Sequence, residues 1–246
     1  MQMQYLFFLI FVISCSQSTN PKLPEPLEGD LAISTQTLPG VVKVLSNVAC
    51  TGAFVSPRAV LTAAHCLQQG GPYHIRSHGI NLTTTKAYAM AQTAQSGKND
   101  LGILVMDPPI APEKVVPIGR LPKVGETLNL IGYGCNNTET RGGAGIKRMG
   151  TNVLVRIRDY LELSTPLPKS KNIIGPKNRA GSCFGDSGSP LLKRTGDIYN
   201  VVGVDHGALI YDEEQLSVFV NLYDSDNRNF IESVNAEENL GISYPN

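Results

Sequence analysis

Three residues far apart in the chain, His65, Asp100 and Ser187, have the types and local contexts needed for nucleophilic catalysis. Each lies in a distinctive motif: Thr-Ala-Ala-His-Cys at 62–66, Asn-Asp-Leu-Gly-Ile-Leu at 99–104 and Gly-Asp-Ser-Gly-Ser-Pro at 185–190. A serine hydroxyl is a weak nucleophile near neutral pH, and it becomes reactive when an imidazole accepts its proton and a carboxylate orients that imidazole. The three residues therefore predict acyl transfer, with Ser187 as nucleophile, His65 as general base and Asp100 as the orienting carboxylate.

The order of these residues, His then Asp then Ser, separates the pattern from others that use the same chemistry. Subtilisin-like enzymes run Asp, His, Ser, and α/β-hydrolases run Ser, Asp, His. On its motifs the chain resembles the chymotrypsin/trypsin family of serine proteases, roughly over residues 38–236. The resemblance implies an all-β fold, with two antiparallel six-stranded β-barrels of chymotrypsin-like type, a C-terminal α-helix and an active site between the barrels.

The resemblance also assigns roles to the neighbours of Ser187. The backbone N–H groups of Gly185 and Ser187 would form the oxyanion hole, and glycine at 185 turns its N–H toward the substrate without an intruding side chain. In the family, the carboxylate at the position of Asp186 is buried against an amino terminus released by activation. No Ile-Val-Gly-Gly-like activation sequence precedes Cys50, so another cation is expected to neutralise Asp186. The candidate cations are Arg141, Lys147 and Arg148. The alternative is that they form a solvated loop and that activation cleavage occurs elsewhere.

A substrate pocket is expected from Gly181, Asp205, His206 and Ser217. Gly181 lies where the family has its pocket base, and it is not the Asp of trypsin-like enzymes. Asp205 is expected on the pocket wall, where it can hold a basic substrate side chain by a charged hydrogen bond, unless the strand is displaced and Asp205 faces solvent or a neighbouring loop. His206 stands where the family has a serine that contacts the catalytic aspartate, and Ser217 is expected to narrow the pocket mouth. Basic residues at the cleaved position therefore rank ahead of small apolar ones.

The chain has five cysteines, one of them, Cys15, close to the N-terminus. Without it four remain, an even number that suits an oxidising compartment. The resemblance implies a histidine-loop disulfide between Cys50 and Cys66. It also places the loops of Cys135 and Cys183 side by side, so a second disulfide is predicted between them, with two free thiols as the alternative.

The N-terminal residues predict export rather than part of the fold. Residues 5–13 form an apolar run of signal-peptide length, too short to span a bilayer as a helix. Val-Ile-Ser-Cys at 12–15 resembles a bacterial lipoprotein signal with Cys15 as the lipidated residue, although no Lys or Arg precedes the run; the alternative is an ordinary secretory signal. We therefore predict a signal peptide over 1–14 and a polar, Pro-rich, lipid-anchored flexible linker over 15–30.

Composition favours many short strands, since the chain has 24 Gly, 16 Pro and no Trp. Lys plus Arg equals Asp plus Glu at 21 each, so nothing indicates binding to nucleic acid or another polyanion.

Other motifs are weak: His74 and His78 lack further zinc ligands, and Gly-Gly-Ala-Gly at 142–145 lacks the Lys-Ser/Thr of a phosphate-binding loop. We expect no metal and no other cofactor.

Short apolar runs on either side of a Pro-rich connector at 106–112 predict two strand-rich halves. The runs are 41–45, 53–55, 59–62 and 101–106 in the first half, and 127–133, 151–157, 190–193, 199–204 and 216–222 in the second. The predicted protease domain spans 31–236, followed by a tail at 237–246. Its parts are an N-terminal barrel at about 31–112, a C-terminal barrel at about 113–224 and a helix at about 226–236.

These patterns together predict a trypsin-like serine endopeptidase that hydrolyses proteins through an acyl-enzyme. It is expected to be a monomer, exported and either secreted or lipid-anchored in a bacterial cell envelope, at the outer surface or in the periplasm. One rival is a catalytically silent, protease-fold surface binding protein. The unusual residues Asp205 and His206 and the missing activation sequence favour it, whereas the complete set of three catalytic residues argues against it. A second rival is an esterase-like hydrolase using the same residues.

Overall fold

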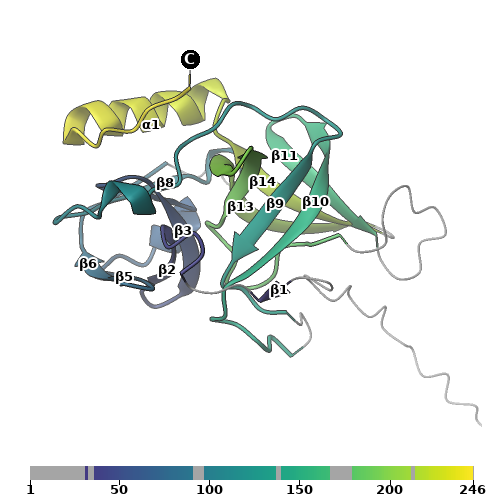
Figure 1. Cartoon of the computed structure of the whole chain (residues 1–246), viewed down its shortest axis with the longest axis horizontal. Helices are drawn as coiled ribbons and strands as arrows, with labels where there is room; N and C mark the ends of the chain where they lie inside the picture. The colour runs from purple at the N-terminus through teal and green to yellow at the C-terminus, as the bar shows by residue number, and fades with distance from the viewer. Residues whose placement is uncertain are drawn as a thin grey trace, which may run out of the picture.

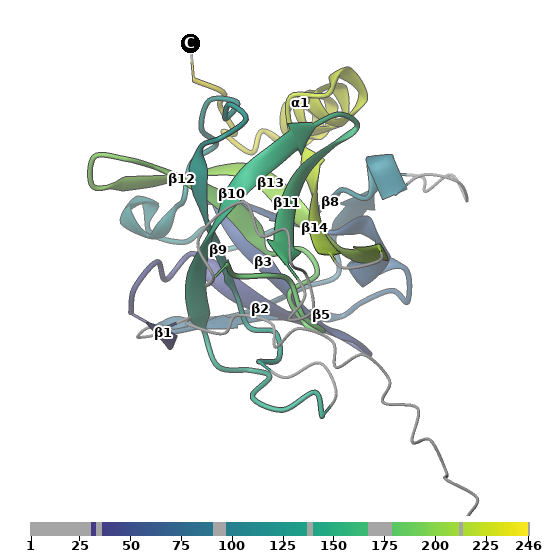
Figure 2. The same cartoon turned by 90° about the vertical axis from the view of Figure 1, so that its right-hand side faces the viewer.

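A computed structural model of the chain describes most of it from Leu31 onward. The described residues are 31–32, 36–90, 97–136, 140–166, 179–211 and 214–245. The predicted signal peptide, the linker and Cys15 lie outside them. The described chain folds into two curled antiparallel β-sheets and one C-terminal helix, with the second barrel standing in front of the first in Figure 2 (Figures 1 and 2). The expected fold class is therefore confirmed.

The first sheet runs in the order β6-β5-β2-β3-β4-β8-β7. Its strands are β2 (Val41–Leu45), β3 (Ala49–Ser56), β4 (Ala59–Thr62), β5 (Tyr73–Ser77), β6 (Ile80–Thr84), β7 (Ala87–Ala89) and β8 (Gly102–Val105). β6 pairs with β5 and β7 pairs with β8, so one bent segment, 80–89, joins the two ends of the sheet. The sheet thus has seven named strands but six chain segments, which agrees with a six-stranded barrel.

The second sheet runs in the order β1-β10-β11-β14-β13-β12-β9, and a β9–β10 pairing closes it. Its strands are β1 (Leu31–Ala32), β9 (Thr127–Gly132), β10 (Arg148–Ile157), β11 (Tyr160–Pro166), β12 (Pro190–Thr195), β13 (Ile198–Tyr211) and β14 (Glu214–Asn221). β9 to β14 therefore form a closed barrel of six strands. β1 is an addition at its edge: residues 31–32, which the sequence placed with the first barrel, pair with β10 of the second.

Each barrel has an apolar interior, and a third apolar cluster joins the two. Phe54 and Ile75 are fully buried inside the first barrel, and Phe219 is fully buried inside the second. The joining cluster contains residues of both barrels and of the helix: Val41, Leu61, Leu101, Ile103, Ile131, Val201, Val204, Val220, Ile231 and Val234. Because burial of apolar side chains is the main favourable term in folding, this cluster holds the barrels in a fixed relation.

The helix α1 (Ser225–Glu238) lies across the first barrel above β8 (Figure 1). Asp224 caps its N-terminus by accepting the backbone N–H of Asp226 at 3.1 Å. Lys98, two residues before the predicted catalytic aspartate, lies 3.2 Å from the Asp224 carboxylate. The helix start is therefore tied to the segment that carries Asp100. No helix in the described part of the chain has the length and apolar character needed to cross a membrane.

Candidate active site

His65 and Asp100 come from neighbouring segments of the first barrel. His65 lies in the short 3₁₀ helix η1 (Ala64–Leu67) just after β4, and Asp100 precedes β8. Because β4 pairs with β8, the two segments lie side by side. The Asp100 carboxylate is fully buried; its Oδ2 accepts from His65 Nδ1 at 2.6 Å and its Oδ1 accepts the backbone N–H of His65 at 2.8 Å. Asp100 thus fixes both the position and the tautomer of the imidazole.

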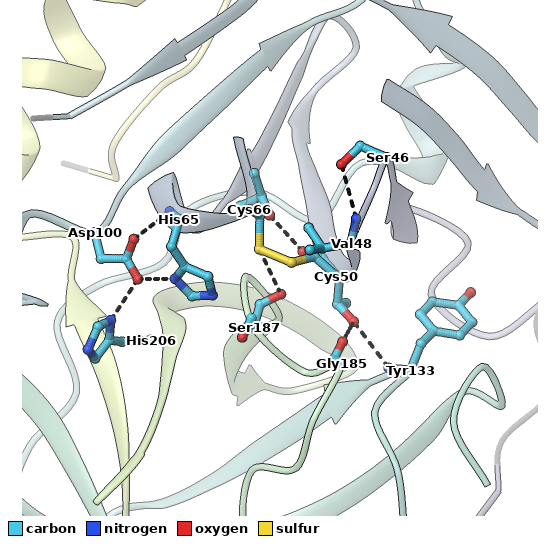
Figure 3. The surroundings of a disulfide bond; sticks show 12 residues. Ser46, Val48, Cys50, His65, Cys66, Asp100, Tyr133, Gly185, Ser187 and His206 are labelled. Atoms are coloured by element: carbon cyan, nitrogen blue, oxygen red, sulfur yellow. Dashed lines mark hydrogen bonds and ion pairs between the residues drawn. A yellow bond between two sulfur atoms is a disulfide. The ribbon is translucent and has the colours of Figure 1, made fainter. Parts of the chain in front are cut away.

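Ser187 comes from the second barrel, on the tight turn before β12. Its carbonyl oxygen accepts the backbone N–H of Thr51 at 2.9 Å and lies 3.8 Å from the sulfur of Cys66, the residue after His65. The His65 ring lies between Asp100 and Ser187 (Figure 3). The fold therefore brings the three predicted residues together where the barrels meet.

Gly188 makes this close approach possible. Its φ is +81°, and a Cβ at this position would lie 2.2 Å from Thr62 Oγ1 and 2.3 Å from the carbonyl oxygen of Thr51. No side chain fits at such distances, and L-residues rarely adopt such a φ. The second glycine of the Gly-Asp-Ser-Gly motif is thus the residue that seats the Ser187 turn on β3 and β4.

A second histidine also binds the carboxylate of Asp100. His206, on β13, donates from Nδ1 to Asp100 Oδ2 at 2.6 Å, and the ring of Tyr160 stacks on it with centroids 5.8 Å apart. Burial acts to raise the pKa of Asp100, but the hydrogen bonds from His206 and His65 outweigh it and hold that pKa well below its usual range. The side chain of His206, predicted as a pocket residue, therefore lies with the catalytic group.

A metal ion could in principle be held by three side chains of the site, those of His65, Asp100 and His206, because their possible ligand atoms all lie within 4.8 Å of one another. Asp100 Oδ2 lies 2.6 Å from Nδ1 of each histidine, which is a hydrogen-bond length. Two ligand atoms about 2.1 Å from a tetrahedral zinc ion would instead lie roughly 3.4 Å from each other. A second group combines His65 with Cys50 and Cys66, whose sulfurs are joined in a disulfide. Both groups are therefore better explained without a metal.

The predicted oxyanion-hole donors, the N–H groups of Gly185 and Ser187, lie on the turn before β12. The Phe184 carbonyl accepts the backbone N–H of Cys135 at 2.9 Å, which fixes the peptide unit that contains the N–H of Gly185. Gly185 itself has a φ of +98°. Within the described part of the chain, no acceptor takes the N–H of Gly185 or of Ser187. Both donors are thus available for a substrate oxygen.

Asp186 is buried and held by the main chain. Its carboxylate accepts the backbone N–H groups of Gly134 at 2.7 Å and Cys183 at 3.0 Å. Burial raises the pKa of Asp186 to about 6, while these hydrogen bonds and the charge of Arg148 act in the opposite direction. A Cβ on Gly132 or Gly134 would lie 2.1 Å or 2.3 Å from a carboxylate oxygen, so the Gly-Tyr-Gly sequence at 132–134 is shaped around this group.

Only Arg148 among the three predicted cations acts on Asp186. Arg148 donates from Nη1 to the Gly143 carbonyl at 2.7 Å, and no direct ion pair to Asp186 is found among the described residues. Lys147 is buried, donates to carbonyls at 37 and 38, and has its pKa lowered by burial to about 8. Arg141 lies over the ring of Phe184. The expected internal cation is thus at most a neighbour of Asp186, whose main partners are backbone amides.

Two disulfides connect the loops of the site, in the pairing that the resemblance implied. Cys50–Cys66 has a Cα–Cα distance of 6.3 Å and joins the end of β3 nearest the site to the His65 segment. Cys135–Cys183 has a Cα–Cα distance of 5.4 Å and joins the Gly-Tyr-Gly loop to the segment before Ser187. Each bridge therefore connects a loop that carries a predicted catalytic residue to a neighbouring element.

Residues 29–224 match the protein-family model described as Trypsin. The chain belongs to the trypsin family. A chymotrypsin from Phaedon cochleariae is 24% identical over 183 residues, which cover 66% of this chain and 62% of that relative. The alignment thus spans less than two thirds of the relative's length.

Several solved structures share the fold of this trypsin-family chain. They are the scabies mite inactivated protease paralogue S-D1 (TM-score 0.67, 17% identity, covering 85% of this chain and 97% of that one), human heparin binding protein (0.66, 19%, 89% and 99%) and neuropsin, a serine protease of mouse brain (0.63, 17%, 83% and 98%). At these identities the likeness shows the fold alone.

Asp205, on the expected pocket wall of this trypsin-family chain, is 1% exposed and does not face solvent. Its Oδ1 accepts from Ser182 Oγ at 3.1 Å and from the backbone N–H of Gly207 at 2.9 Å, and its Oδ2 has no partner among the described residues. Burial, and then the charge of Asp186, raise the pKa of Asp205 well above its usual range. This environment favours the neutral form of Asp205, and a cation that reached it would favour the carboxylate.

Polar side chains crowd the expected pocket base at Gly181. A Cβ on Gly181 would lie 3.1 Å from Gln215 Nε2 and 3.2 Å from Thr165 Oγ1. Gln215 donates to the Ser182 carbonyl at 3.0 Å, and Ser217 Oγ accepts the Ser182 N–H at 2.9 Å. Ser217 thus lies at the base with Gly181 and is not placed at a mouth.

Sequence reasoning missed four residues of this site, namely Tyr160, Thr165, Ser182 and Gln215. A signal existed for two of them. Ser182 follows Gly181 directly, and Gln215 is two residues before Ser217 on a strand, where alternate residues share a face. Tyr160 had no such signal, because it reaches His206 only through the pairing of β11 with β14 beside β13.

Proposed function

We propose that this trypsin-family protein is a serine endopeptidase that hydrolyses peptide bonds in proteins through an acyl-enzyme. The observation that supports this most strongly is the hold of Asp100 on both Nδ1 and the backbone N–H of His65, with the imidazole lying toward Ser187. A silent relative has no need of so complete an arrangement. The family membership supports the class of reaction and of substrate.

In the proposed reaction His65 accepts the proton of Ser187 Oγ while the oxygen attacks the substrate carbonyl. The N–H groups of Gly185 and Ser187 stabilise the oxyanion, and His65 then donates the proton to the leaving amine. Water repeats the sequence on the acyl-enzyme. Asp100 stays ionised throughout, because the two histidines hold its pKa low, and it stabilises the charged imidazolium.

We further infer that the enzyme cleaves after Lys or Arg. The support is Asp205, whose buried Oδ2 lacks a partner among the residues that the structure describes. A substrate cation placed there would favour the carboxylate form and form a charge-assisted hydrogen bond with it. The amide of Gln215 fills the adjacent space and has to move aside when such a side chain enters.

The setting of the enzyme is also a proposal. The N-terminal apolar run and the Val-Ile-Ser-Cys sequence support export with a lipid on Cys15 to a bacterial cell envelope, where the protein acts as a monomer. Two disulfides support a compartment outside the reducing cytosol.

Labelling with a fluorescent fluorophosphonate tests the catalytic proposal. The wild-type protein is expected to incorporate the probe and to digest unfolded casein, and Ser187→Ala is expected to do neither while keeping its circular-dichroism spectrum. Labelling with ester hydrolysis but no protein digestion would favour an esterase instead. A folded wild type that never labels would contradict both enzymes.

A catalytically silent binding protein is the second candidate, and one observation favours it. The base of the pocket is occupied by Gln215, Thr165 and Ser217. Two of the similar structures also bear the names of an inactivated protease paralogue and a heparin binding protein. The fluorophosphonate experiment separates this candidate from the protease, because the binder is expected to be folded and unlabelled.

A further inference from the structure

A cavity of about 430 Å³ opens directly beside the oxyanion hole. Gly185 and Cys50 form its end nearest Ser187, so a chain bound across the site would enter it. In Figure 3 Gly185, Cys50 and Tyr133 lie on one side of Ser187, and Asp100 and His206 lie on the other. The cavity is therefore on the side away from β13.

The side of β13 holds the part of the substrate that becomes the acyl group, since Asp205 and Gly181 lie there. The peptide continues through Ser187 to the opposite side, which receives the leaving amine and the residues after it. The cavity thus faces the leaving half of the substrate.

Two cations line this cavity, Lys43 on β2 and Arg141 on the loop after Cys135, and no carboxylate of the described residues lines it. Lys43 Nζ lies 5.1 Å from the ring centre of Tyr133, and Arg141 Cζ lies 4.3 Å from that of Phe184. Neither cation pairs with a carboxylate in the described part of the chain. The rings position the cations while their N–H groups remain free to bind an anion.

We propose that this cavity binds the carboxylate of an Asp or Glu side chain one or two residues after the cleaved bond. The charge of Lys43 and Arg141 recognises the carboxylate, and the exposed ring of Phe184 covers the methylene groups of the same side chain. The proposal rests on the proposed protease function and adds the substrate class on its leaving side.

Acyl transfer tests the leaving side separately from the acyl side. An ester substrate acylates Ser187, and an added peptide amine then attacks the acyl carbon, so that Ser187 departs with the proton returned by His65. The added amines are Ala-Glu-amide and Glu-Ala-amide, each compared with the same peptide carrying Gln in place of Glu. We expect at least one Glu peptide to compete with water for the acyl-enzyme about tenfold better than its Gln counterpart. The preference is expected to shrink in 1 M salt, because exposed charges are screened.

Variants assign the preference to the two cations. Lys43→Met and Arg141→Gln are each expected to remove most of the Glu preference, and Arg141→Glu is expected to favour a Lys amine over Glu. Arg194→Gln on the distant β12–β13 hairpin makes the same charge change and is expected to keep the wild-type preference. Equal transfer to Glu and Gln amines by an active wild type would overturn the proposal.

A failure of the protease assignment gives a different result. In that case no acyl-enzyme forms, and binding of fluorescent versions of the same peptides to Ser187→Ala, followed by anisotropy, replaces transfer as the measurement. Tighter binding of Glu than of Gln peptides, lost in Arg141→Glu, would support the cavity even in a silent protein. Equal binding would overturn it.

Discussion

At the scale of single residues, Asp100 is the group on which the site depends. Its carboxylate accepts two imidazole N–H groups and one backbone N–H, all within 2.8 Å. His206 is the unusual member, since it stands where the resemblance expects a serine. It touches the carboxylate and not the reacting atoms, so it is a positioning residue for His65.

Replacing His206 measures that positioning. His206→Ala is expected to lower kcat on the order of tenfold with little change in KM, because a hydrogen bond to a charged group is lost and the substrate contacts remain. His206→Ser, which restores a hydroxyl donor, is expected to recover part of the loss. Steady-state kinetics on an ester substrate make the comparison. A rise in KM with unchanged kcat would mean that His206 acts in the pocket instead.

Asp186 gives the protein a pH-dependent stability. Its pKa of about 6 lies above the ordinary value of 3.8, so between these pH values the folded protein binds a proton that the unfolded chain has released. The free energy of unfolding contributed by this group therefore falls as the pH rises through that window, by about 3 kcal/mol in all.

Asp186→Asn removes the titrating group while keeping its shape. The free energy of unfolding of the variant minus that of the wild type is expected to increase from pH 4 to pH 7, as measured by urea denaturation. Carboxyl groups that do not interact with Asp186 titrate equally in both proteins and cancel in the difference. Asp205 does not cancel, because loss of the Asp186 charge lowers its pKa, and this changes the difference in the same direction. A difference that stays constant with pH would show that Asp186 is ionised throughout this range.

At the scale of elements, the site is a meeting of short loops held on two rigid barrels. η1 and the segment before β8 come from the first barrel, whereas the Ser187 turn comes from the second. The turn is seated by hydrogen bonds from Thr51 on β3, whose N–H reaches Ser187 and whose Oγ1 reaches Gly185. The alignment of the nucleophile with its base therefore depends on this seat.

Gly188→Ala is the sharpest test of the seat. We expect it to lower the free energy of unfolding by about 3 kcal/mol or more and to abolish activity, because the added Cβ would overlap Thr62 and Thr51. Gly196→Ala is the matched control: its φ is +60°, nothing lies within 4 Å of the added Cβ, and its cost should be about 1 kcal/mol. Thermal unfolding and fluorophosphonate labelling report both effects. Similar losses in the two variants would show that φ alone matters.

At the scale of the whole molecule, one apolar cluster sets the relation of the barrels. The cluster includes Leu101, the residue after Asp100, and Val204, two residues before His206. The Asp100 carboxylate and its second histidine thus project from the edge of the inter-barrel core. Each disulfide lies within one barrel, Cys50–Cys66 in the first and Cys135–Cys183 in the second, and restricts a loop beside the site.

The two disulfides are expected to differ in their effect on stability. Cys135–Cys183 joins residues 48 apart in sequence and Cys50–Cys66 joins residues 16 apart. The loop entropy removed from the unfolded chain corresponds to about 4 kcal/mol for the longer loop and about 3 kcal/mol for the shorter. Each disulfide can be removed by a double Cys→Ser variant and the free energy of unfolding measured by urea denaturation. Loss of Cys135–Cys183 is expected to lower this free energy more than loss of Cys50–Cys66. The reverse order would show that native contacts outweigh loop entropy.

The sequence alone identified the family, the three candidate catalytic residues and much of the framework. Local motifs identify His65, Asp100 and Ser187, because each of them requires particular neighbours in the sequence, such as Gly188 after Ser187. Apolar runs located strands such as β2 and β4 at their observed bounds. Strands β5, β6, β7 and β11 were missed, because their apolar residues are few or are interrupted by polar ones.

Only the tertiary structure decided which groups those residues meet. The backbone amides around Asp186, the turn of His206 toward Asp100 and the shared cavity of Lys43 and Arg141 each join segments far apart in the chain. Such contacts depend on how the two barrels pack and on the direction of each side chain. Neither the packing of the barrels nor the direction of a side chain can be predicted from a local pattern, because motifs and periodicity depend only on neighbours within a few residues.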